Sequence, residues 1–322
     1  MIEVYRSLAE MAGNRQRLSG VAVGNFDGVH AGHRQLFRRA VDASHQHGWR
    51  PSVLTFDPHP SRVVAPDRAP KLLNVGDERW ELMEAEGIAQ VLVHPFDGSF
   101  AGLSPEEFAR RVLVDGMHAG GVFVGENFRF GAKHAGDVEL LKQLGRDMGF
   151  VVEVVPSVYV RGRMVSSTEI RKLLSEGKVS LACRLLERPY WVQGRVVTGE
   201  GIGSKQTVPT LNLQTESEVL PADGVYISQA RDLEDGRGWD SITNVGVRPT
   251  FSGERRTIET FLLSPFDGKT PRRIRLAFLR RVREERKFES PEALKAQIMR
   301  DVGIAIRYHK RVSRLRRVEI LP

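Results

Sequence analysis

Short apolar runs alternate with longer amphipathic stretches along the first half of the chain. The expected strands span residues 20–23, 52–56, 90–95, 121–124 and 151–155. The expected helices span residues 34–47, 77–86, 105–115 and 137–148. Strands that alternate with helices pair in parallel, so this half predicts a doubly wound, Rossmann-like α/β sheet. Ligands bind such sheets outside the carboxyl ends of the strands, where the turns after strands 20–23, 52–56 and 121–124 should meet.

The pattern changes after Lys178. A helical stretch over residues 173–187 ends at Pro189, and short β-rich runs separated by Gly and Pro follow it. These runs span residues 191–197, 210–213, 224–230, 241–247, 257–263 and 274–283. Close spacing of strands and turns predicts an antiparallel barrel. A final helix should begin at Ser290, an N-cap residue followed by Pro291. The change in pattern predicts two domains, residues 1–187 and 188–322.

Composition fits two globular domains of ordinary size. The chain has 322 residues, of which 41% are hydrophobic and 27% charged, enough for a sizeable core. No apolar run is long enough to span a bilayer, and no signal peptide is expected. Cys183 is the single cysteine, which excludes an intramolecular disulfide and disfavours a cysteine-based zinc site. These features predict a cytoplasmic protein without a membrane partner.

The net charge of +8 is concentrated towards the C-terminal end. A net positive charge can favour the binding of nucleic acid, acidic membranes or anionic small substrates. Acidic residues interrupt the basic run at Glu284, Glu285 and Glu289, and no aromatic residues alternate with it as in a base-stacking surface. A solvated basic face is therefore favoured over a nucleic-acid interface.

The segment from Val21 to His33 carries the clearest chemical signal. An apolar strand runs into a turn rich in Gly, Asn and Asp, and His30 and His33 stand at the head of the next helical pattern. Backbone N–H groups and the positive helix end favour anions at such a turn. Histidines three residues apart lie on one side of a first helical turn, where both can donate hydrogen bonds to one phosphate. The alternative is a capping turn with two surface histidines.

This segment also carries a family resemblance. His30-Ala31-Gly32-His33 resembles the H-x-G-H signature of adenylyl-transferring nucleotidyltransferases. The longer string from Gly24 to His30 resembles that of bacterial bifunctional riboflavin kinase/FAD synthetases. The resemblance implies a nucleotidyltransferase domain followed by a riboflavin kinase barrel with a C-terminal helix. It implies catalytic roles for the two histidines and contacts with ATP at a further set of turn residues, namely Gly24, Phe26, Asp27 and Gly32.

A second segment, Ser166 to Arg171, resembles the S-S-T-x-I-R signature of the same enzymes. Hydroxyl groups of Ser166, Ser167 and Thr168 at a helix start can hydrogen-bond phosphate, and Arg171 can hold charge that develops on it. The alternative is an N-cap box with an exposed arginine. Together with the histidine turn, the segment is interpreted as part of an ATP site.

Two further turns resemble the family's flavin and nucleotide contacts. Asn127 and Phe128 lie in a G-x-N-F-x-F-G segment, where Asn127 could bond substrate and Phe128 could pack on a ring. His59 lies in a T-F-D-P-H-P turn and is a weaker candidate for flavin contact. A tight turn with core aromatics would explain the first segment, and two prolines alone would explain the second.

The second half contains a glycine-rich loop over residues 199–206, followed by P-T-x-N. The loop resembles that of riboflavin kinases, in which Gly201, Gly203 and Lys205 would approach ATP phosphates. Thr210 and Asn212 supply oxygen ligands suited to Mg²⁺. Ser204 and Thr207 depart from the common bacterial pattern and leave the phosphate contacts open. No helix follows the loop, so a Walker A motif is disfavoured, and an ordinary hairpin is the alternative.

Glu259 stands on one face of an expected strand, where an exposed glutamate is the usual explanation. By resemblance it matches the family's catalytic base, which would take the proton of the riboflavin 5′-hydroxyl. Asn244 and Arg283 match positions near the flavin.

The leading hypothesis is an enzyme that phosphorylates riboflavin to FMN in the barrel and adenylylates FMN to FAD in the sheet domain. It would use ATP with Mg²⁺ and release pyrophosphate in the second step. The alternatives are an FAD synthetase with an impaired kinase domain, and an RNA-binding protein built on an adenylation fold. The sequence leaves the oligomeric state open.

Overall fold

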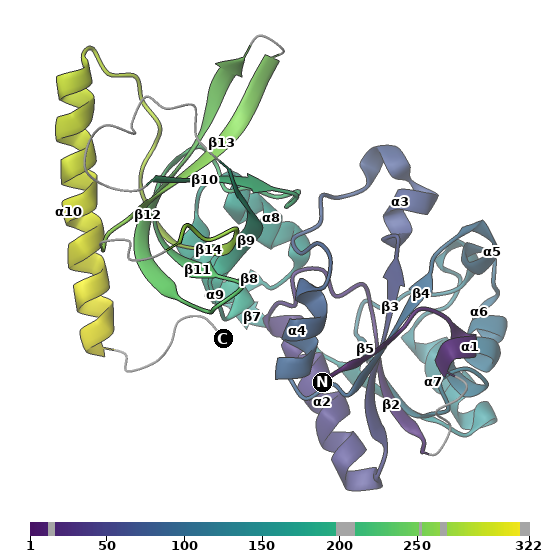
Figure 1. The fold of residues 1–322 in the computed structure, drawn as a ribbon. Helices are drawn as coiled ribbons and strands as arrows, with labels where there is room; N and C mark the ends of the chain where they lie inside the picture. The colour runs from purple at the N-terminus through teal and green to yellow at the C-terminus, as the bar shows by residue number, and fades with distance from the viewer. Residues whose placement is uncertain (12–16, 198–209, 251–252, 265–268, 316–322) are drawn as a thin grey trace. The chain divides into compact units, whose positions relative to one another are not determined.

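The computed structural model describes residues 1–11, 17–197, 210–250, 253–264 and 269–315. Its chain divides into two compact units, Met1–Ser167 and Thr168–Pro322, and each is described by itself (Figure 1). The glycine-rich loop, with Gly201, Gly203 and Lys205, lies outside the described residues.

The first unit is built on a six-stranded sheet of order β1-β4-β3-β2-β5-β6 in which every neighbouring pair is parallel. The strands are β1 (Glu3–Tyr5), β2 (Ser19–Val23), β3 (Arg50–Asp57), β4 (Gln90–Pro95), β5 (Ala119–Gly125) and β6 (Val151–Val155). The chain moves outward from β2 in one direction through β3 and β4, then returns to β5 on the other side. The carboxyl end of β2 is therefore at the switch point, where ligands of such sheets bind.

Helices cover both faces of this sheet, as a doubly wound fold requires (Figure 1). The longer ones are α2 (Ala31–His47), α4 (Glu78–Ala85), the π-helical η3 (Phe108–Val114) and α7 (Val138–Met148). The shorter elements are α1 (Leu8–Met11), α3 (Pro60–Val64), η2 (Pro66–Arg68), α5 (Gly98–Ala101), α6 (Pro105–Glu107), η4 (Ala132–His134), β7 (Tyr159–Val160) and β8 (Arg163–Met164).

The period-two alternation of the strands divides the core between the two faces. Val21 and Val23 of β2 pack in one cluster with buried residues of η3 and α7. Gly20 and Ala22 point to the other face, where a Cβ on Gly20 would lie 2.2 Å from Ser44 Oγ of α2. Only glycine therefore lets α2 approach β2 this closely.

The second unit is a closed six-stranded antiparallel barrel of order β10-β13-β12-β11-β14-β9. Its strands are β9 (Tyr190–Val197), β10 (Thr210–Thr215), β11 (Gly224–Asp232), β12 (Gly238–Thr250), β13 (Gly253–Leu262) and β14 (Arg273–Arg283). The helix α8 (Ser167–Ser175) begins at the division between the units, α9 (Val179–Leu186) packs on β14 and β9, and α10 (Pro291–Leu315) follows the last strand.

Alternate residues of the barrel strands face two different environments. Ile242 of β12 packs with Val302 and Ala305 of α10, so its face is the outer one. Thr243 faces the interior, where its hydroxyl bonds Ser228 Oγ (2.7 Å) and Thr260 Oγ1 (3.0 Å). Side chains such as Thr243 thus fill the interior of the barrel, and α10 covers part of its outer face. Side chains on the outer face can therefore line a cavity beneath α10.

The structure confirms the fold class and most predicted elements. Ser290 caps α10, because its Oγ accepts a hydrogen bond from Ala293 N (3.1 Å), and Pro291 is the first helical residue. The single helix predicted over residues 173–187 is wrong. Gly177 has a φ of +70° and separates α8 from α9, a conformation that favours glycine at a helix end.

The predicted domain limits, residues 1–187 and 188–322, stay a prediction. In the structure α8 and α9 group with the barrel rather than with the sheet. Within the helix predicted over residues 105–115, hydrogen bonding changes from α to π at Phe108.

Candidate active sites

The turn after β2 has an unusual backbone. Phe26, Gly28 and Val29 all have positive φ angles, of 49°, 87° and 39°. Left-handed conformations at bulky residues cost free energy and recur at ligand sites. The buried Asp27 carboxylate holds the turn, since its Oδ1 accepts hydrogen bonds from Leu73 N (2.8 Å) and Asn74 N (3.4 Å). Asp27 was predicted to contact ATP, and here its Oδ1 organises the turn.

His30 and His33 lie together, as their spacing predicts. His30 is the N-cap of α2, and its Nδ1 accepts a hydrogen bond from His33 N (3.3 Å). In the neutral ring this leaves the proton on Nε2, which can donate to an anion. The two imidazoles stack with centroids 3.5 Å apart, and Phe26 contacts His33 edge-on at 5.2 Å.

The His33 ring is kept neutral by its surroundings. Burial lowers the pKa of His33 well below 6.5, and the adjacent His30 lowers it further. Its Nδ1 is buried without a hydrogen-bond partner among the residues that the structure describes. Such an orphaned polar atom is costly and is typical of a site that a ligand completes.

Two glycines leave room beside these rings. A Cβ on Gly32 would lie 3.3 Å from the His30 ring, and one on Gly24 would lie 3.0 Å from the Phe26 ring. Side chains at either position would press on the ring that the site needs. The two glycines therefore let the rings keep their places at the helix start, where free backbone N–H groups favour an anion.

The S-S-T-x-I-R segment is divided between the units. Ser167 Oγ donates to the Asp27 backbone oxygen (2.8 Å), a hydrogen bond within the first unit that holds Ser167 at the histidine turn. Ser166 is half-buried in the first unit. Thr168 is exposed and Arg171 half-buried, both on α8 in the second unit.

The flavin candidates of the first unit follow β3 and β5 at the same edge of the sheet as the histidine turn, as expected. His59 caps α3, with its Nδ1 accepting from Ser61 N (3.2 Å). Phe128 stacks on Phe130 with centroids 5.5 Å apart, and Asn127 is exposed. Sequence reasoning missed an aromatic group at this edge, although each member lies at or just beyond a strand end: Phe56, His94, Phe96 and Phe100.

In the barrel, strand register brings three candidate residues into one row. Glu259 on β13 is directly opposite Asn212 on β10 and Asn244 on β12. Opposed residues of antiparallel strands share a face, so one carboxylate and two amides lie side by side. Thr210, two residues before Asn212, is opposite Phe261 on the same face.

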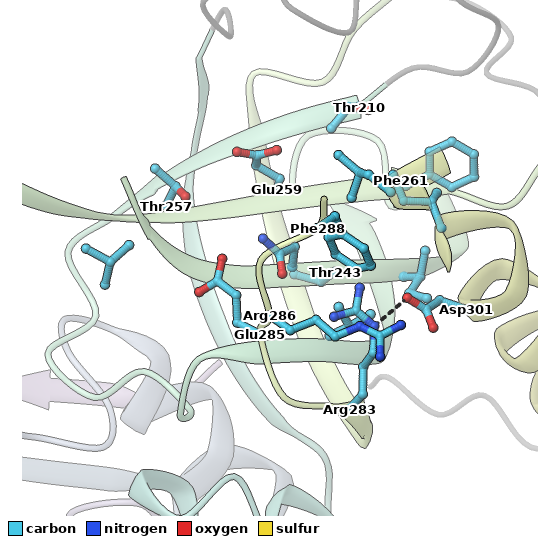
Figure 2. A pocket seen from close by; sticks show the side chains of 16 residues that line it. Thr210, Thr243, Thr257, Glu259, Phe261, Arg283, Glu285, Arg286, Phe288 and Asp301 are labelled. Atoms are coloured by element: carbon cyan, nitrogen blue, oxygen red, sulfur yellow. Dashed lines mark hydrogen bonds and ion pairs between the residues drawn. The ribbon is translucent and has the colours of Figure 1, made fainter. Parts of the chain in front are cut away.

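Glu259 and Asn244 of this row border a cavity of about 400 Å³ on the outer face of the barrel (Figure 2). Its walls include Glu259, Asn244, Thr210 and Arg283, four of the predicted site residues. The segment after β14 and helix α10 form the opposite wall. Glu285, Arg286 and Phe288 line it from the segment that follows Arg283, and sequence reasoning did not single out the lining residues of α10, namely Leu294, Ile298 and Asp301.

A polar network fixes this opposite wall. Arg283 Nε donates to Asp301 Oδ2 (2.8 Å), and Gln297 Nε2 donates to Asp301 Oδ1 (2.7 Å). Arg286 Nη2 donates to Gln297 Oε1 (2.5 Å), which anchors the segment after β14 to α10. The Arg283 and Arg286 guanidinium groups lie 5.5 Å and 5.0 Å from the Phe288 ring.

Replacement of Asp301 by alanine should destabilise the protein by about 3 kcal/mol, because it leaves a half-buried guanidinium unpaired. The Asp301 and Arg283 side chains are only 3% and 19% exposed. Urea unfolding measures the loss. The matched control is Asp235→Ala, which breaks an exposed pair with Arg237 and should change the free energy of unfolding far less. Equal losses in the two variants would contradict the anchoring role.

The donors near Glu259 suit a hard cation. Thr210 and Asn212 offer a hydroxyl and an amide oxygen, which Mg²⁺ accepts together with phosphate and water. Among the residues that the structure describes, no group of three or more His, Cys, Asp or Glu side chains could hold a metal.

Comparison with known proteins bears directly on both sites. A family model described as FAD synthetase matches residues 13–169, and one described as riboflavin kinase matches residues 186–309. A bifunctional riboflavin kinase/FMN adenylyltransferase of Pseudomonas fluorescens is 36% identical over 284 residues, covering 88% of this chain and 90% of the relative. This chain belongs to that family. The Escherichia coli K12 member is 32% identical and covers 93% of this chain and 96% of its own.

A solved structure has the same fold as this bifunctional family member. It is a Streptococcus pneumoniae protein named a macrolide-efflux protein, with a TM-score of 0.83 and 27% sequence identity. The match covers 94% of this chain and 97% of the other. Across the described part of the present chain, no helix combines the length and apolarity needed to cross a membrane.

Proposed function

We propose that the protein converts riboflavin to FMN in the barrel cavity and FMN to FAD at the histidine turn. The observation that carries the proposal is that each family model covers one of the two candidate sites on a single chain. ATP is the co-substrate of both steps.

In the first step Glu259 acts as the base. Its carboxylate accepts the proton of the riboflavin 5′-hydroxyl while that oxygen attacks the γ-phosphorus of ATP. The bond from the γ-phosphorus to its bridging oxygen breaks, and ADP leaves. Asn244 and Arg283 border the same cavity and would orient the flavin. Mg²⁺, held by Thr210 and Asn212, would neutralise charge on the phosphates.

The second step needs little help from a base, because the attacking phosphate of FMN is already anionic. One of its oxygens attacks the α-phosphorus of ATP, the bond to the bridging oxygen breaks, and pyrophosphate leaves. His30 Nε2–H and the His33 imidazole would donate hydrogen bonds to the developing negative charge. Positioning by the helix start and by these donors supplies most of the rate enhancement.

A time course tests the proposal directly. Purified protein with riboflavin, ATP and Mg²⁺ should produce FMN first and FAD afterwards. ADP should equal the sum of FMN and FAD, and pyrophosphate should equal FAD alone. FAD formation only from supplied FMN would favour the alternative with an impaired kinase. Absence of both products, with RNA affinity that falls steeply with salt, would favour the RNA-binding alternative. The expectations of no nucleic-acid partner and a cytoplasmic location stay predictions.

A further inference from the structure

Arg79 is a buried cation that forms no ion pair with the residues that the structure describes in the first unit. It lies in the first turn of α4 and is 7% exposed. Its Nε is buried without a partner, and no hydrogen bond or ion pair joins its guanidinium to any residue that the structure describes. Its guanidinium carbon lies 4.9 Å from the centroid of the Trp80 ring.

Other arginines of the unit are more exposed and yet paired. The Arg34 and Arg39 side chains are 23% and 57% exposed, and they pair with Glu86 and Glu153 at 2.6 Å and 2.5 Å. An unpaired buried charge loses its hydration without compensation. Burial accordingly lowers the pKa of Arg79, and the Asp57 and Asp27 carboxylates partly offset that change. The cost indicates a partner that is not part of the chain.

The surroundings of Arg79 place it beside the histidine turn. Helix α4 precedes β4, so its first turn lies towards the carboxyl edge of the parallel sheet. Asp27 in the histidine turn accepts hydrogen bonds from Leu73 N and Asn74 N. Asn74 Nδ2 in turn donates to Glu78 Oε2 (2.8 Å), the residue immediately before Arg79. A short chain of buried hydrogen bonds thus fixes the start of α4 against the turn.

Asp57 is the second carboxylate that acts on Arg79. It ends β3 and begins the turn that carries His59, the flavin candidate. The carboxylates that act on Arg79 therefore come from the ATP turn and from the flavin turn, and the Arg6 guanidinium acts on it as a further positive charge. A phosphate at the point where the two substrates react would lie between these two turns.

We propose that Arg79 binds the phosphate monoester of FMN and holds it for attack on the α-phosphorus of ATP. The inference rests on the proposed adenylylation of FMN at the histidine turn. A guanidinium offers up to five N–H donors in a fixed plane, which matches two oxygens of a phosphate dianion. Riboflavin lacks this phosphate, so Arg79 also selects the phosphorylated flavin for adenylylation.

The test compares Arg79→Gln and Arg79→Met with wild type in the full-length protein. The KM for FMN should rise about 10- to 100-fold, the usual value of hydrogen bonds to a charged group, while the KM for ATP changes little. Riboflavin phosphorylation should be unchanged. Arg39→Gln removes an exposed arginine of the same unit and should leave every rate at the wild-type value.

Thermal melting without ligand separates binding from structure. Arg79→Met should melt at or above the wild-type temperature, because it removes an uncompensated buried charge and keeps an unbranched apolar side chain. An unchanged KM for FMN would overturn the inference, as would a rise in the KM for ATP alone. Lower melting with parallel loss of both activities would instead assign Arg79 a structural role and overturn it too. If wild type makes no FAD from FMN, the proposed function itself fails.

Discussion

Glu259→Gln should lower riboflavin phosphorylation by about 10²–10⁴-fold, the usual contribution of a positioned base. Glutamine keeps the size and hydrogen bonding of the side chain but cannot accept a proton at neutral pH. The row formed by Asn212, Glu259 and Asn244 should persist, since strand register sets it. Initial rates of FMN formation measure the effect.

Two controls keep that result specific. Adenylylation of supplied FMN by Glu259→Gln should stay at the wild-type rate, because that site is in the other unit. Glu234→Gln changes an exposed glutamate in the turn after β11 and should leave the kinase rate unchanged. Wild-type FMN formation by Glu259→Gln, in protein that melts normally, would contradict its role as the base.

His33→Ala and His30→Ala should each lower FAD formation from FMN by about 10²–10³-fold, the cost of losing one preorganised donor in the transition state. Riboflavin phosphorylation should be nearly intact. His30 also caps α2, so its removal carries a stability cost of about 1 kcal/mol. His30→Asn restores a capping oxygen without the imidazole and should remain as inactive as His30→Ala.

His45→Ala is the matched control on the same helix. His45 is exposed in the last turn of α2, far along the helix from the phosphate end, and should affect neither activity. Equal loss of both activities in the His30 and His33 variants would point to misfolding. FAD formation within threefold of wild type would remove the histidines from the proposed chemistry.

The sequence predicted the architecture where patterning is strong. The apolar run ending at Val23, the histidine pair and the following helix pattern together predicted a ligand site at the carboxyl end of this strand. The edge strand β1 was missed because Glu3–Tyr5 is too short to show a period. The break at Gly177 was missed because apolar spacing continues across it, although its positive φ needs glycine.

Site residues were predictable where a motif or one face of a strand defined them. Glu259 and Asn244 carried such signals, and register then brought them together across β12 and β13. Arg79 carried none, because its burial and its lack of an ion pair with any described residue depend on how α4 packs. The Asp301 network was hidden for the same reason, since it joins residues from β14 and α10.

A mixing experiment tests most directly the claim of two separate sites that share FMN as a diffusing intermediate. Glu259→Gln alone and His33→Ala alone should each make little FAD from riboflavin, ATP and Mg²⁺. An equal mixture of the two full-length variants should restore FAD formation, because His33→Ala supplies FMN and Glu259→Gln adenylylates it. If the mixture makes no more FAD than the two variants assayed apart, while both proteins are folded, the assignment of one reaction to each site is wrong.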